Sequence, residues 1–388
     1  MRILIHVQHL LGIGHLQRIG LIARALDAAG VTVTLLSGGM NWPGLDPGGA
    51  RLVQLPPLRA GAGGFGDLVD AENRPLDTAT RDRRRRIVLD TLAEIQPDLV
   101  LIETYPFGRR ALRFELEPLI EAARALRPRP VLACSIRDIV ATKPDPARRQ
   151  AIIATLRRDF DLLLVHADQH FIRLEASFPE AALLADIQHY TGFVAAPAPL
   201  PGPDTPSGEI VVSAGGGAAG AALLQAAKAA RPLSRHAAMP WRLITGRNLP
   251  EADVVALAAD LSPGLVIERH RGDFPALLAR CRVSVSQAGY NTVLDLLQAR
   301  VPAVLVPFAE GGETEQPLRA ARLQALGLAE TVSEAALTPE ILAAAIDRAT
   351  VPVATGFALD GAERSAALLI AACSGAVARH ATDLSDPC

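Results

Sequence analysis

The chain has 388 residues, of which 49% are hydrophobic and 21% are charged, and its formal net charge at pH 7 is −2. This composition is typical of a soluble globular protein, and at about 100–200 residues per domain the length predicts two domains. The near-neutral charge excludes a general attraction to phosphate backbones, so we expect no nucleic-acid partner. The four cysteines share no close spacing, which argues against a zinc site and a disulfide framework.

No apolar run reaches the roughly 18–20 residues that a membrane-spanning helix needs. The N-terminal stretch MRILIHVQHLLGIGH contains three histidines and no small-residue cleavage site. We therefore interpret it as a buried first strand rather than a signal peptide. The sequence predicts a cytoplasmic protein without a transmembrane segment.

The first half of the chain alternates short apolar strands with helical segments. A strand over Ile3–Val7 is followed by a helix over His15–Ala29, whose apolar residues recur at helical spacing. Further strands are predicted at Val31–Leu36, Arg51–Leu55, Leu99–Ile102, Val131–Ser135 and Leu162–Val165. Strands of continuous Val, Ile and Leu between helices predict a parallel, doubly wound α/β sheet. Leu58–Thr80 holds several glycines without periodicity, so we predict a long functional loop there.

A segment rich in Pro, Ala and Gly, Ala195–Gly208, is predicted to be a linker. A second α/β series follows it, with strands at Ile210–Ser213, Trp241–Thr245, Leu265–Glu268, Val283–Ser286 and Ala303–Val306. The sequence therefore predicts an N-terminal domain over residues 1–194 and a second domain over residues 209–373.

The turn after the first strand reads Gly12-Ile13-Gly14-His15-Leu16-Gln17-Arg18. A dinucleotide fingerprint is excluded, because Gln17 stands where the third glycine is needed and the second strand ends at Ser37-Gly38-Gly39 without an acid. The glycines allow a ligand to approach the backbone closely. His15 then lies at the carboxyl end of the first strand, where open α/β sheets bind ligands. A packing or capping role for His15 is the alternative.

Two small-residue turns open helices in the second half. The first is Ser213–Gly220, and the second is Ser286–Gly289, which leads into Tyr290-Asn291-Thr292. A helix N-terminus presents backbone N–H groups and the positive end of the dipole, so either turn can bind phosphate. Inside the second helix, Asp295 can accept two hydrogen bonds from a vicinal diol. A tight structural turn and a solvated acid are the respective alternatives.

Polar side chains end three strands of the first half: Glu103, Arg137-Asp138, and His166 with Asp168. Such strand ends line the ligand crevice of open sheets, so we expect either acceptor contacts or structural roles there.

Two charged motifs in the first half have weaker interpretations. Asp159-Phe160-Asp161 precedes a strand at the edge away from the crevice, so we do not interpret it as a metal motif. No catalytic metal or cofactor is predicted. The basic run Arg81–Arg86 is either a solvated helix face or a contact for an anionic acceptor or lipid surface.

Val283–Ala320, VSVSQAGYNTVLDLLQARVPAVLVPFAEGGETEQPLRA, resembles the nucleotide-sugar half of GT-B glycosyltransferases. It is most similar to glycosyltransferase family 28, whose known member adds N-acetylglucosamine to a lipid-linked peptidoglycan precursor. The Gly-x-Gly-His turn is similar to the same family. Arg18 extends that turn to the Gly-x-Gly-His-x-x-Arg pattern of a bacterial nucleotide-sugar hydrolase with the same fold. The resemblance implies two Rossmann-like domains facing across a cleft, with a last helix near residues 361–373 crossing back to the first domain.

The resemblance also implies site residues. Asp295 stands where the family has a ribose-binding glutamate, Gln316 matches a sugar-contacting glutamine, and Glu315 is placed to take a second hydroxyl. Ala218 replaces the serine of the family's Gly-Gly-Ser loop, Asp295 is one methylene shorter than glutamate, and the loop before Gln316 is one residue longer. The remaining donor-binding residues are Gly14, Gly216, Gly217, Ala218, His270, Arg271, Ser286, Ala288, Gly289, Tyr290, Asn291 and Thr292.

These features together predict a glycosyltransferase that uses a nucleotide-diphosphate sugar, UDP-linked by resemblance, in an inverting and metal-independent reaction. His15 is the predicted general base, with Glu103 as the second catalytic candidate. The sequence does not identify the acceptor. The basic run Arg81–Arg86 fits a lipid-linked or anionic acceptor and peripheral contact with a membrane. A nucleotide-sugar hydrolase and a noncatalytic nucleotide-sugar-binding protein remain the alternatives. A related isomerase of the same fold, which acts on UDP-N-acetylglucosamine, needs paired acids around its site, and the sequence does not show that pattern.

Overall fold

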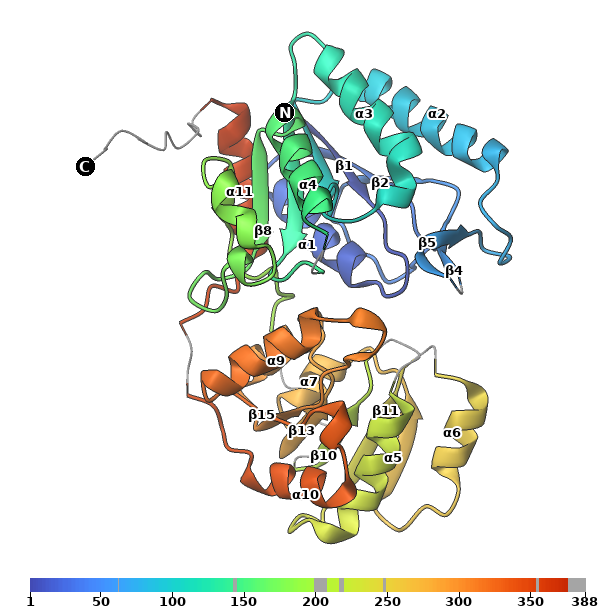
Figure 1. The fold of residues 1–388 in the computed structure, drawn as a ribbon, viewed down its shortest axis with the longest axis vertical. Coiled ribbons are helices and arrows are strands. Elements are labelled where there is room, and N and C mark those ends of the chain that lie inside the picture. The colour runs from blue at the N-terminus through green and yellow to red at the C-terminus, as the bar shows by residue number, and fades with distance from the viewer. Residues whose placement is uncertain are drawn as a thin grey trace, which may run out of the picture. The chain divides into compact units, whose positions relative to one another are not determined.

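The computed structural model describes residues 1–61, 63–141, 145–198, 208–215, 220–246, 249–353 and 356–375. The chain divides into two compact units. The first contains Met1–Ala195 and the segment that begins at Phe357, and the second is Ala196–Gly356. Each unit is a parallel sheet covered by helices (Figure 1).

The first unit has a seven-stranded sheet in the order β3-β2-β1-β6-β7-β8-β9. All its strand pairs are parallel. The strands are β1 (Arg2–Val7), β2 (Thr32–Ser37), β3 (Arg51–Gln54), β6 (Leu99–Glu103), β7 (Val131–Arg137), β8 (Leu162–His166) and β9 (Gln188–Tyr190). The helices are α1 (Gly14–Ala28), α2 (Thr78–Ile95), α3 (Arg113–Ala125) and α4 (Pro146–Asp159), with 3₁₀ turns at Arg110–Leu112, Leu174–Ala176 and Pro179–Leu184.

Local sequence explains where these helices begin. Asp77 precedes α2, and its side chain accepts a hydrogen bond from the Thr80 N–H at 2.7 Å, which is a standard N-cap. Asp145 caps α4 in the same way, and Pro146 occupies the first helical position, where its missing N–H costs nothing. The central strands are apolar on both faces because helices cover both sides of the sheet.

The last helix, α11 (Gly361–Cys373), packs in the first unit although it follows the second unit in sequence. Its residues Ala362, Ala366 and Leu369 belong to the same buried cluster as the apolar face of α1. Gly361 allows this packing, because a Cβ atom there would lie 2.6 Å from the Gly192 carbonyl oxygen. The two units are therefore not two continuous stretches of chain.

The second unit has a six-stranded sheet in the order β12-β11-β10-β13-β14-β15, again all parallel. Trp241 is fully buried in its hydrophobic core. The strands are β10 (Ile210–Ser213), β11 (Trp241–Thr245), β12 (Leu265–Arg269), β13 (Val283–Ser286), β14 (Ala303–Leu305) and β15 (Glu330–Thr331). The helices are α5 (Ala221–Ala230), α6 (Glu251–Ala258), α7 (Phe274–Leu278), α8 (Tyr290–Ala299), α9 (Glu315–Ala325) and α10 (Pro339–Arg348), with 3₁₀ turns at Arg231–Leu233, Glu310–Gly312 and Glu334–Ala336.

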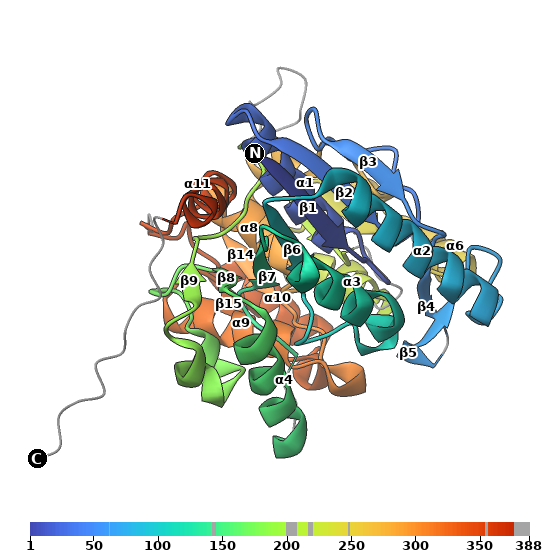
Figure 2. The same cartoon turned by 90° about the horizontal axis from the view of Figure 1, so that it is seen from above.

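The structure differs from the sequence prediction at Leu58–Thr80. This segment is not a structureless loop, because it contains the antiparallel ribbon β4 (Arg59–Gly61) and β5 (Gly64–Val69) and the start of α2 (Figure 2). The edge strands β9 and β15 were also missed, since three and two residues are too few to show a periodic pattern. No helix within the described ranges has the length and apolar character needed to cross a membrane.

Candidate active site

The carboxyl ends of β1 and β6 bring His15 and Glu103 together. These strands pair in parallel, with His6 opposite Ile102, so the turn after β1 and the last residue of β6 meet at one edge of the sheet. His15 Nδ1 lies 2.6 Å from Glu103 Oε1. The His15 side chain remains 19% exposed, whereas that of Glu103 is fully buried. The partly open imidazole is therefore backed by a buried carboxylate.

The same carboxylate oxygen receives two further donors. Arg18, one turn after His15 on α1, approaches Glu103 Oε1 with Nη2 at 2.5 Å. The Thr104 hydroxyl donates to the same atom at 2.6 Å. Arg109 Nη2 lies 4.0 Å from the other oxygen, Oε2, as an ion pair. Arg18 had a sequence signal in the Gly-x-Gly-His-x-x-Arg pattern, whereas Thr104 and Arg109 had none.

The protonation states in this cluster follow from burial and charge. Burial lowers the pKa of His15 to about 3; Glu103 opposes this shift, and Arg109 and Arg18 reinforce it. Burial alone would raise the pKa of Glu103, but His15, Arg18 and Arg109 together hold it well below its usual range. At neutral pH the cluster therefore contains a carboxylate and a neutral imidazole. Because Nδ1 then donates to Glu103, Nε2 carries the lone pair that can accept a proton.

Backbone strain is concentrated in the short loop after β6. Thr104 has φ of 67° and Arg109 has φ of 63°, both in the left-handed region. A β-branched residue adopts this conformation rarely, at a cost on the order of 1–3 kcal/mol. The Gly108 N–H closes the loop on the Thr104 carbonyl at 2.9 Å, and Arg109 Nε donates to the Gln8 carbonyl at 2.8 Å. Both of these strained residues contact Glu103, in addition to His15 and Arg18 of α1.

The other strand-end candidates of the first unit have structural partners. His166 is fully buried, with Nε2 2.7 Å from the Ser135 hydroxyl and Nδ1 2.8 Å from the Thr191 hydroxyl. Burial holds the pKa of His166 well below its usual range. Asp168 accepts a hydrogen bond from the Ala358 N–H at 3.0 Å, and so anchors the segment that leads into α11. These contacts favour the structural interpretation of both residues over acceptor binding.

The remaining strand end, Arg137-Asp138, also has local contacts. Asp138 is buried and accepts a hydrogen bond from the Ile139 N–H at 2.9 Å, while Arg137 is partly buried.

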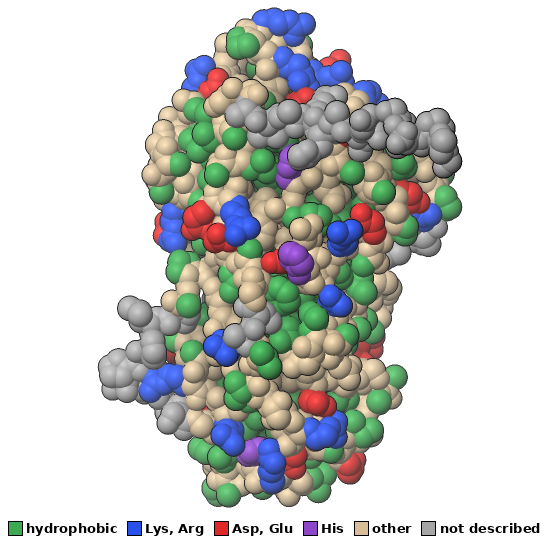
Figure 3. All heavy atoms as spheres, turned by 90° about the vertical axis from the view of Figure 1, so that its left-hand side faces the viewer, with side chains coloured by type: hydrophobic (Ala, Val, Ile, Leu, Met, Phe, Trp, Pro, Cys, Tyr) green, Lys and Arg blue, Asp and Glu red, His purple; other side chains and the backbone are tan. Residues whose placement is uncertain are grey.

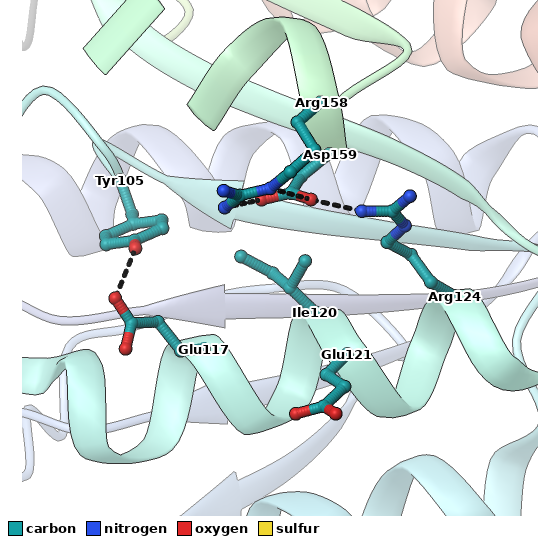
Figure 4. Close-up of a pocket in the computed structure, with 7 residues that line it drawn as sticks. All are labelled: Tyr105, Glu117, Ile120, Glu121, Arg124, Arg158 and Asp159. Carbon is teal, nitrogen blue, oxygen red and sulfur yellow. Dashed lines mark hydrogen bonds and ion pairs between the residues drawn. The ribbon is translucent and has the colours of Figure 1, made fainter. Parts of the chain in front are cut away.

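The aspartates of Asp159-Phe160-Asp161 are bound by arginines. Asp159 pairs with Arg124 at 2.5 Å and with Arg158 at 2.7 Å, and Asp161 pairs with Arg129 at 3.1 Å. Asp159 borders a surface hollow of about 330 Å³ between α3 and α4. Figure 4 shows Arg124 and Arg158 pointing towards the Asp159 carboxylate there. The hollow is lined by Tyr105, Glu117, Ile120, Glu121, Arg124, Arg158 and Asp159. It contains none of the predicted site residues.

The basic run Arg81–Arg86 lies on α2 and has two different environments. Arg84 is buried, and its guanidinium pairs with Glu115 at 2.7 Å, so it holds α2 on α3. Arg81, Arg83, Arg85 and Arg86 are exposed. Figure 3 draws a different face of the molecule from the one that carries α2, and on that face basic and acidic side chains are interspersed.

In the second unit, side chains of α9 hold the turn before α8. The Ala288 N–H donates to Gln316 Oε1 at 3.0 Å, and the Phe308 N–H donates to the same oxygen at 3.2 Å. Arg319, which is only 1% exposed, donates from Nη1 to the Ala288 carbonyl at 2.8 Å. Ala288 and the amide oxygen of Gln316, both predicted to bind the donor, thus bond to each other in this structure. Arg319 was missed, because it reads as an ordinary helical arginine.

The first turn of α8 contains the other residues predicted at this site. Ser286 is buried, and its hydroxyl has no hydrogen-bond partner among the described residues. Gly289 immediately precedes α8, and Asn291 and Thr292 are partly buried in its first turn. The Tyr290 ring is only 5% exposed and lies 5.9 Å from the Arg319 guanidinium, so it packs beneath the turn. The first turn of a helix directs backbone N–H groups outward, which suits a diphosphate.

Asp295 is partly buried on α8, and burial raises its pKa to about 7. A carboxyl group that is desolvated without a compensating cation is a candidate for ligand binding. A bound diol would supply the hydrogen-bond donors that favour its ionised form.

The remaining predicted donor-binding residues differ in burial and in the partners that they contact. Glu315 is buried at the start of α9, where the Glu313 carboxylate accepts hydrogen bonds from the N–H groups of Glu315 and Gln316 at 2.6 and 3.3 Å. Arg271 is tied to Asp273 and Glu268, whereas His270 is exposed. Gly14 is the first residue of α1. The predicted residues Gly216, Gly217 and Ala218 lie outside the described ranges.

Two parallel α/β units, together with the solved structures they resemble, define the GT-B fold. The chain superimposes on MurG of Acinetobacter baumannii with a TM-score of 0.58 at 17% identity, covering 95% of this chain and 99% of that one. The glycosyltransferase VinC in complex with dTDP gives a TM-score of 0.59 at 16% identity, covering 97% and 96% of the two chains. At these identities the similarity shows the fold alone.

Within that fold, residues 210–363 match the glycosyltransferase family 28 C-terminal domain. A UDP-N-acetylglucosamine–N-acetylmuramyl-(pentapeptide) pyrophosphoryl-undecaprenol N-acetylglucosamine transferase of Synechococcus sp. (strain CC9605) is 28% identical over 142 residues, 37% of this chain and 38% of the relative. The enzyme of the same name from Methylobacterium radiotolerans is 36% identical over 96 residues, 25% of this chain and 26% of the relative. The matches thus span well under half of these relatives, and the chain is a GT-B protein whose second unit is similar to family 28.

Proposed function

We propose that this protein is a glycosyltransferase that moves a sugar from a nucleoside-diphosphate sugar to an acceptor hydroxyl. We propose UDP as the nucleotide of the donor. The observation that carries the proposal is the contact between His15 and Glu103 in a GT-B chain whose second unit matches the family 28 domain. A neutral imidazole oriented by a buried carboxylate is a general base.

In the proposed reaction, His15 Nε2 takes the proton of the acceptor hydroxyl. The hydroxyl oxygen forms a bond to the anomeric carbon, and the bond from that carbon to the diphosphate oxygen breaks, so the configuration inverts. The electron pair leaves with the nucleoside diphosphate. The N-terminal turn of α8 stabilises the leaving charge through backbone N–H groups and the helix dipole, without a metal ion.

Donor recognition is assigned to the second unit. Asp295 accepts hydrogen bonds from the ribose hydroxyls, while Gln316 and Arg319 keep the turn at Ala288 in place. The names of the curated relatives support a lipid-linked, diphosphate-bearing acceptor, and a cytoplasmic location is part of this proposal. The exposed arginines of α2 provide a surface for such peripheral contact.

Nucleotide-sugar hydrolysis is the second candidate, favoured by the Arg18–Glu103 contact, because Arg18 completes the hydrolase-like Gly-x-Gly-His-x-x-Arg pattern. Water would then replace the acceptor hydroxyl at His15 Nε2.

A two-stage assay separates these functions. Thermal shifts with UDP, dTDP, GDP and their sugar conjugates first identify the donor; a ligand at about 100 times its Kd should add about 2.7 kcal/mol of stability. Release of free sugar and of nucleoside diphosphate is then measured with and without lipid-linked and soluble hydroxyl acceptors. Acceptor-dependent nucleotide release supports a transferase, and equal sugar and nucleotide release without acceptor supports a hydrolase. Donor binding without either product would overturn both.

A further inference from the structure

Glu103 Oε1 is shared by donors from two different elements. His15 and Arg18 approach it from α1 at 2.6 and 2.5 Å, and Thr104 approaches it from the loop after β6 at 2.6 Å. The two nitrogen–oxygen distances are shorter than the usual range of about 2.7–2.9 Å, and the hydroxyl distance lies within the range of about 2.5–2.7 Å that is typical of an O–H donor to a carboxylate. The carboxylate is fully buried, so its orientation depends on these partners rather than on water.

Arg18 is placed to act on the imidazole as well as on the carboxylate. Its Nη2 lies 3.4 Å from His15 Nδ1, and its side chain is only 2% exposed. A guanidinium at this distance repels a proton added to the imidazole. The positive charge of Arg18 also offsets the negative charge of the ionised Glu103, which would otherwise attract that proton. Both effects favour the neutral imidazole.

His15 Nδ1 has two possible partners, and they require different tautomers. A protonated Nδ1 donates to Glu103, whereas a deprotonated Nδ1 accepts a hydrogen bond from Arg18. The carboxylate at 2.6 Å is a far stronger acceptor for Nδ1–H than the imidazole at 3.4 Å is for Arg18. The proton therefore resides on Nδ1. The charged groups facing the imidazole are Glu103 of β6, Arg18 of α1 and Arg109 of the loop after β6.

We propose that Arg18 and Thr104 are positioning residues that hold Glu103 ionised and hold His15 neutral with its proton on Nδ1. This arrangement leaves Nε2 as the proton acceptor over the whole physiological pH range. The inference rests on the proposed function only for the use of Nε2 in catalysis, because the protonation state itself is a property of the ligand-free protein.

The direct test is ¹⁵N NMR of the histidine side chains in the full-length protein, with the His15 signals assigned by loss in His15→Gln. We expect wild-type His15 to be neutral between pH 5 and 8, with Nδ1 protonated, and the titration is continued below pH 5 because the midpoint lies there. Arg18→Gln should raise the pKa of His15 by about 1–2 pH units, since one nearby cation is lost and Glu103 is less compensated. Arg18→Lys should restore most of the wild-type titration.

Arg24→Gln is the matched control, because Arg24 lies on the same helix and forms an exposed ion pair with Asp46. It should leave the His15 titration unchanged. Thr104→Ala, with Thr104→Ser as its rescue, tests the carboxylate without removing a charge. We expect the alanine variant to weaken the Nδ1 tautomer preference and the serine variant to retain it. These variants also keep the test decisive if Arg18→Gln unfolds.

An Nε2-protonated His15 in the wild type, or an unchanged titration in Arg18→Gln together with an unchanged tautomer in Thr104→Ala, would overturn the inference. Where turnover is measured, the acidic limb of the kcat/KM profile should move with the NMR titration while the donor KM stays constant. A protein with the expected NMR behaviour but no sugar transfer would contradict the proposed function and leave the positioning role intact.

Discussion

In the first unit, His15, Arg18 and Thr104 converge on one buried carboxylate oxygen, whereas in the second unit Gln316 and Arg319 support a stretch of backbone. In the proposed function, the first arrangement prepares a side chain to exchange a proton. The second prepares backbone N–H groups and a helix terminus to receive charge. Both lie at the carboxyl ends of parallel strands, the edge at which open α/β sheets bind ligands.

This difference predicts how each site responds to mutation. A site made of side-chain chemistry loses its reaction when one group is removed, while the fold and ligand affinity remain. A site made of supported backbone loses affinity when its supports are removed, because the turn itself moves. The following experiments test that separation, from the largest expected effect to the smallest.

His15→Ala should give the largest loss. We expect turnover to fall by about 10²–10⁴-fold, the usual contribution of a general base, with donor affinity and unfolding temperature close to wild type. Transfer, hydrolysis and donor binding are measured on the same preparation. His170→Ala is the control, because its side chain is 81% exposed in the same unit. A variant that retains near-wild-type rates in both assays would remove His15 from the mechanism.

Asp295→Ala should act on binding instead of chemistry. A ribose contact is made equally in the ground and transition states, so its loss raises KM and leaves kcat largely unchanged. The cost of about 1–3 kcal/mol for a lost charge-assisted hydrogen bond corresponds to roughly 5–150-fold in affinity. Calorimetry with the donor nucleotide measures it, with Glu340→Ala on α10 as the exposed control. Unchanged affinity would make Asp295 a structural acid.

Gln316→Ala should weaken donor binding through the backbone of the turn. The substitution removes the oxygen that accepts the Ala288 and Phe308 N–H groups, at a cost of about 1 kcal/mol for each neutral hydrogen bond. If the whole cost falls on binding, we expect roughly thirtyfold weaker nucleotide binding, together with faster amide exchange at Ala288. Gln298→Ala is a suitable control, since its amide donates to the Ala196 carbonyl away from the turn. Weaker binding without faster exchange at Ala288 would instead indicate a direct contact between Gln316 and the donor.

The sequence predicted the principal strands of both units, because runs of apolar residues between helical segments are local patterns. It also placed His15 and Glu103 individually at strand ends. It did not show that they touch, because 88 residues separate them and only the parallel pairing of β1 with β6 brings them together. Thr104 escaped notice because its role depends on a left-handed backbone conformation that favours glycine or asparagine in most proteins.

In the second unit the sequence indicated the turn itself but not the side chains that hold it in place. The Ser286–Thr292 turn was identified from its small residues and helix start, which are local signals. The bond from Ala288 to Gln316 joins residues 28 positions apart, and the bond from Arg319 to Ala288 spans 31. A glutamine and an arginine in a polar helix have no periodic signature that indicates which backbone group they hold. Supports of this kind become visible only when the packing of α9 is known.

The last effect concerns stability instead of activity or binding, and it isolates burial at Asp295 from any ligand. Its folded-state pKa of about 7 lies above the ordinary aspartate value of 3.8, so the unfolded chain ionises first as pH rises. Below pH 4 the carboxyl group is protonated in both states and contributes nothing. Between pH 4 and 7 the folded state becomes progressively destabilised, and above pH 7 the penalty is constant. Asp295→Asn, which cannot ionise, should therefore unfold at a higher temperature than wild type at pH 8, with the difference shrinking towards pH 5. Thermal unfolding of both proteins in matched buffers measures this gap, and a gap that does not vary with pH would show that the Asp295 carboxyl group is solvated in the folded protein.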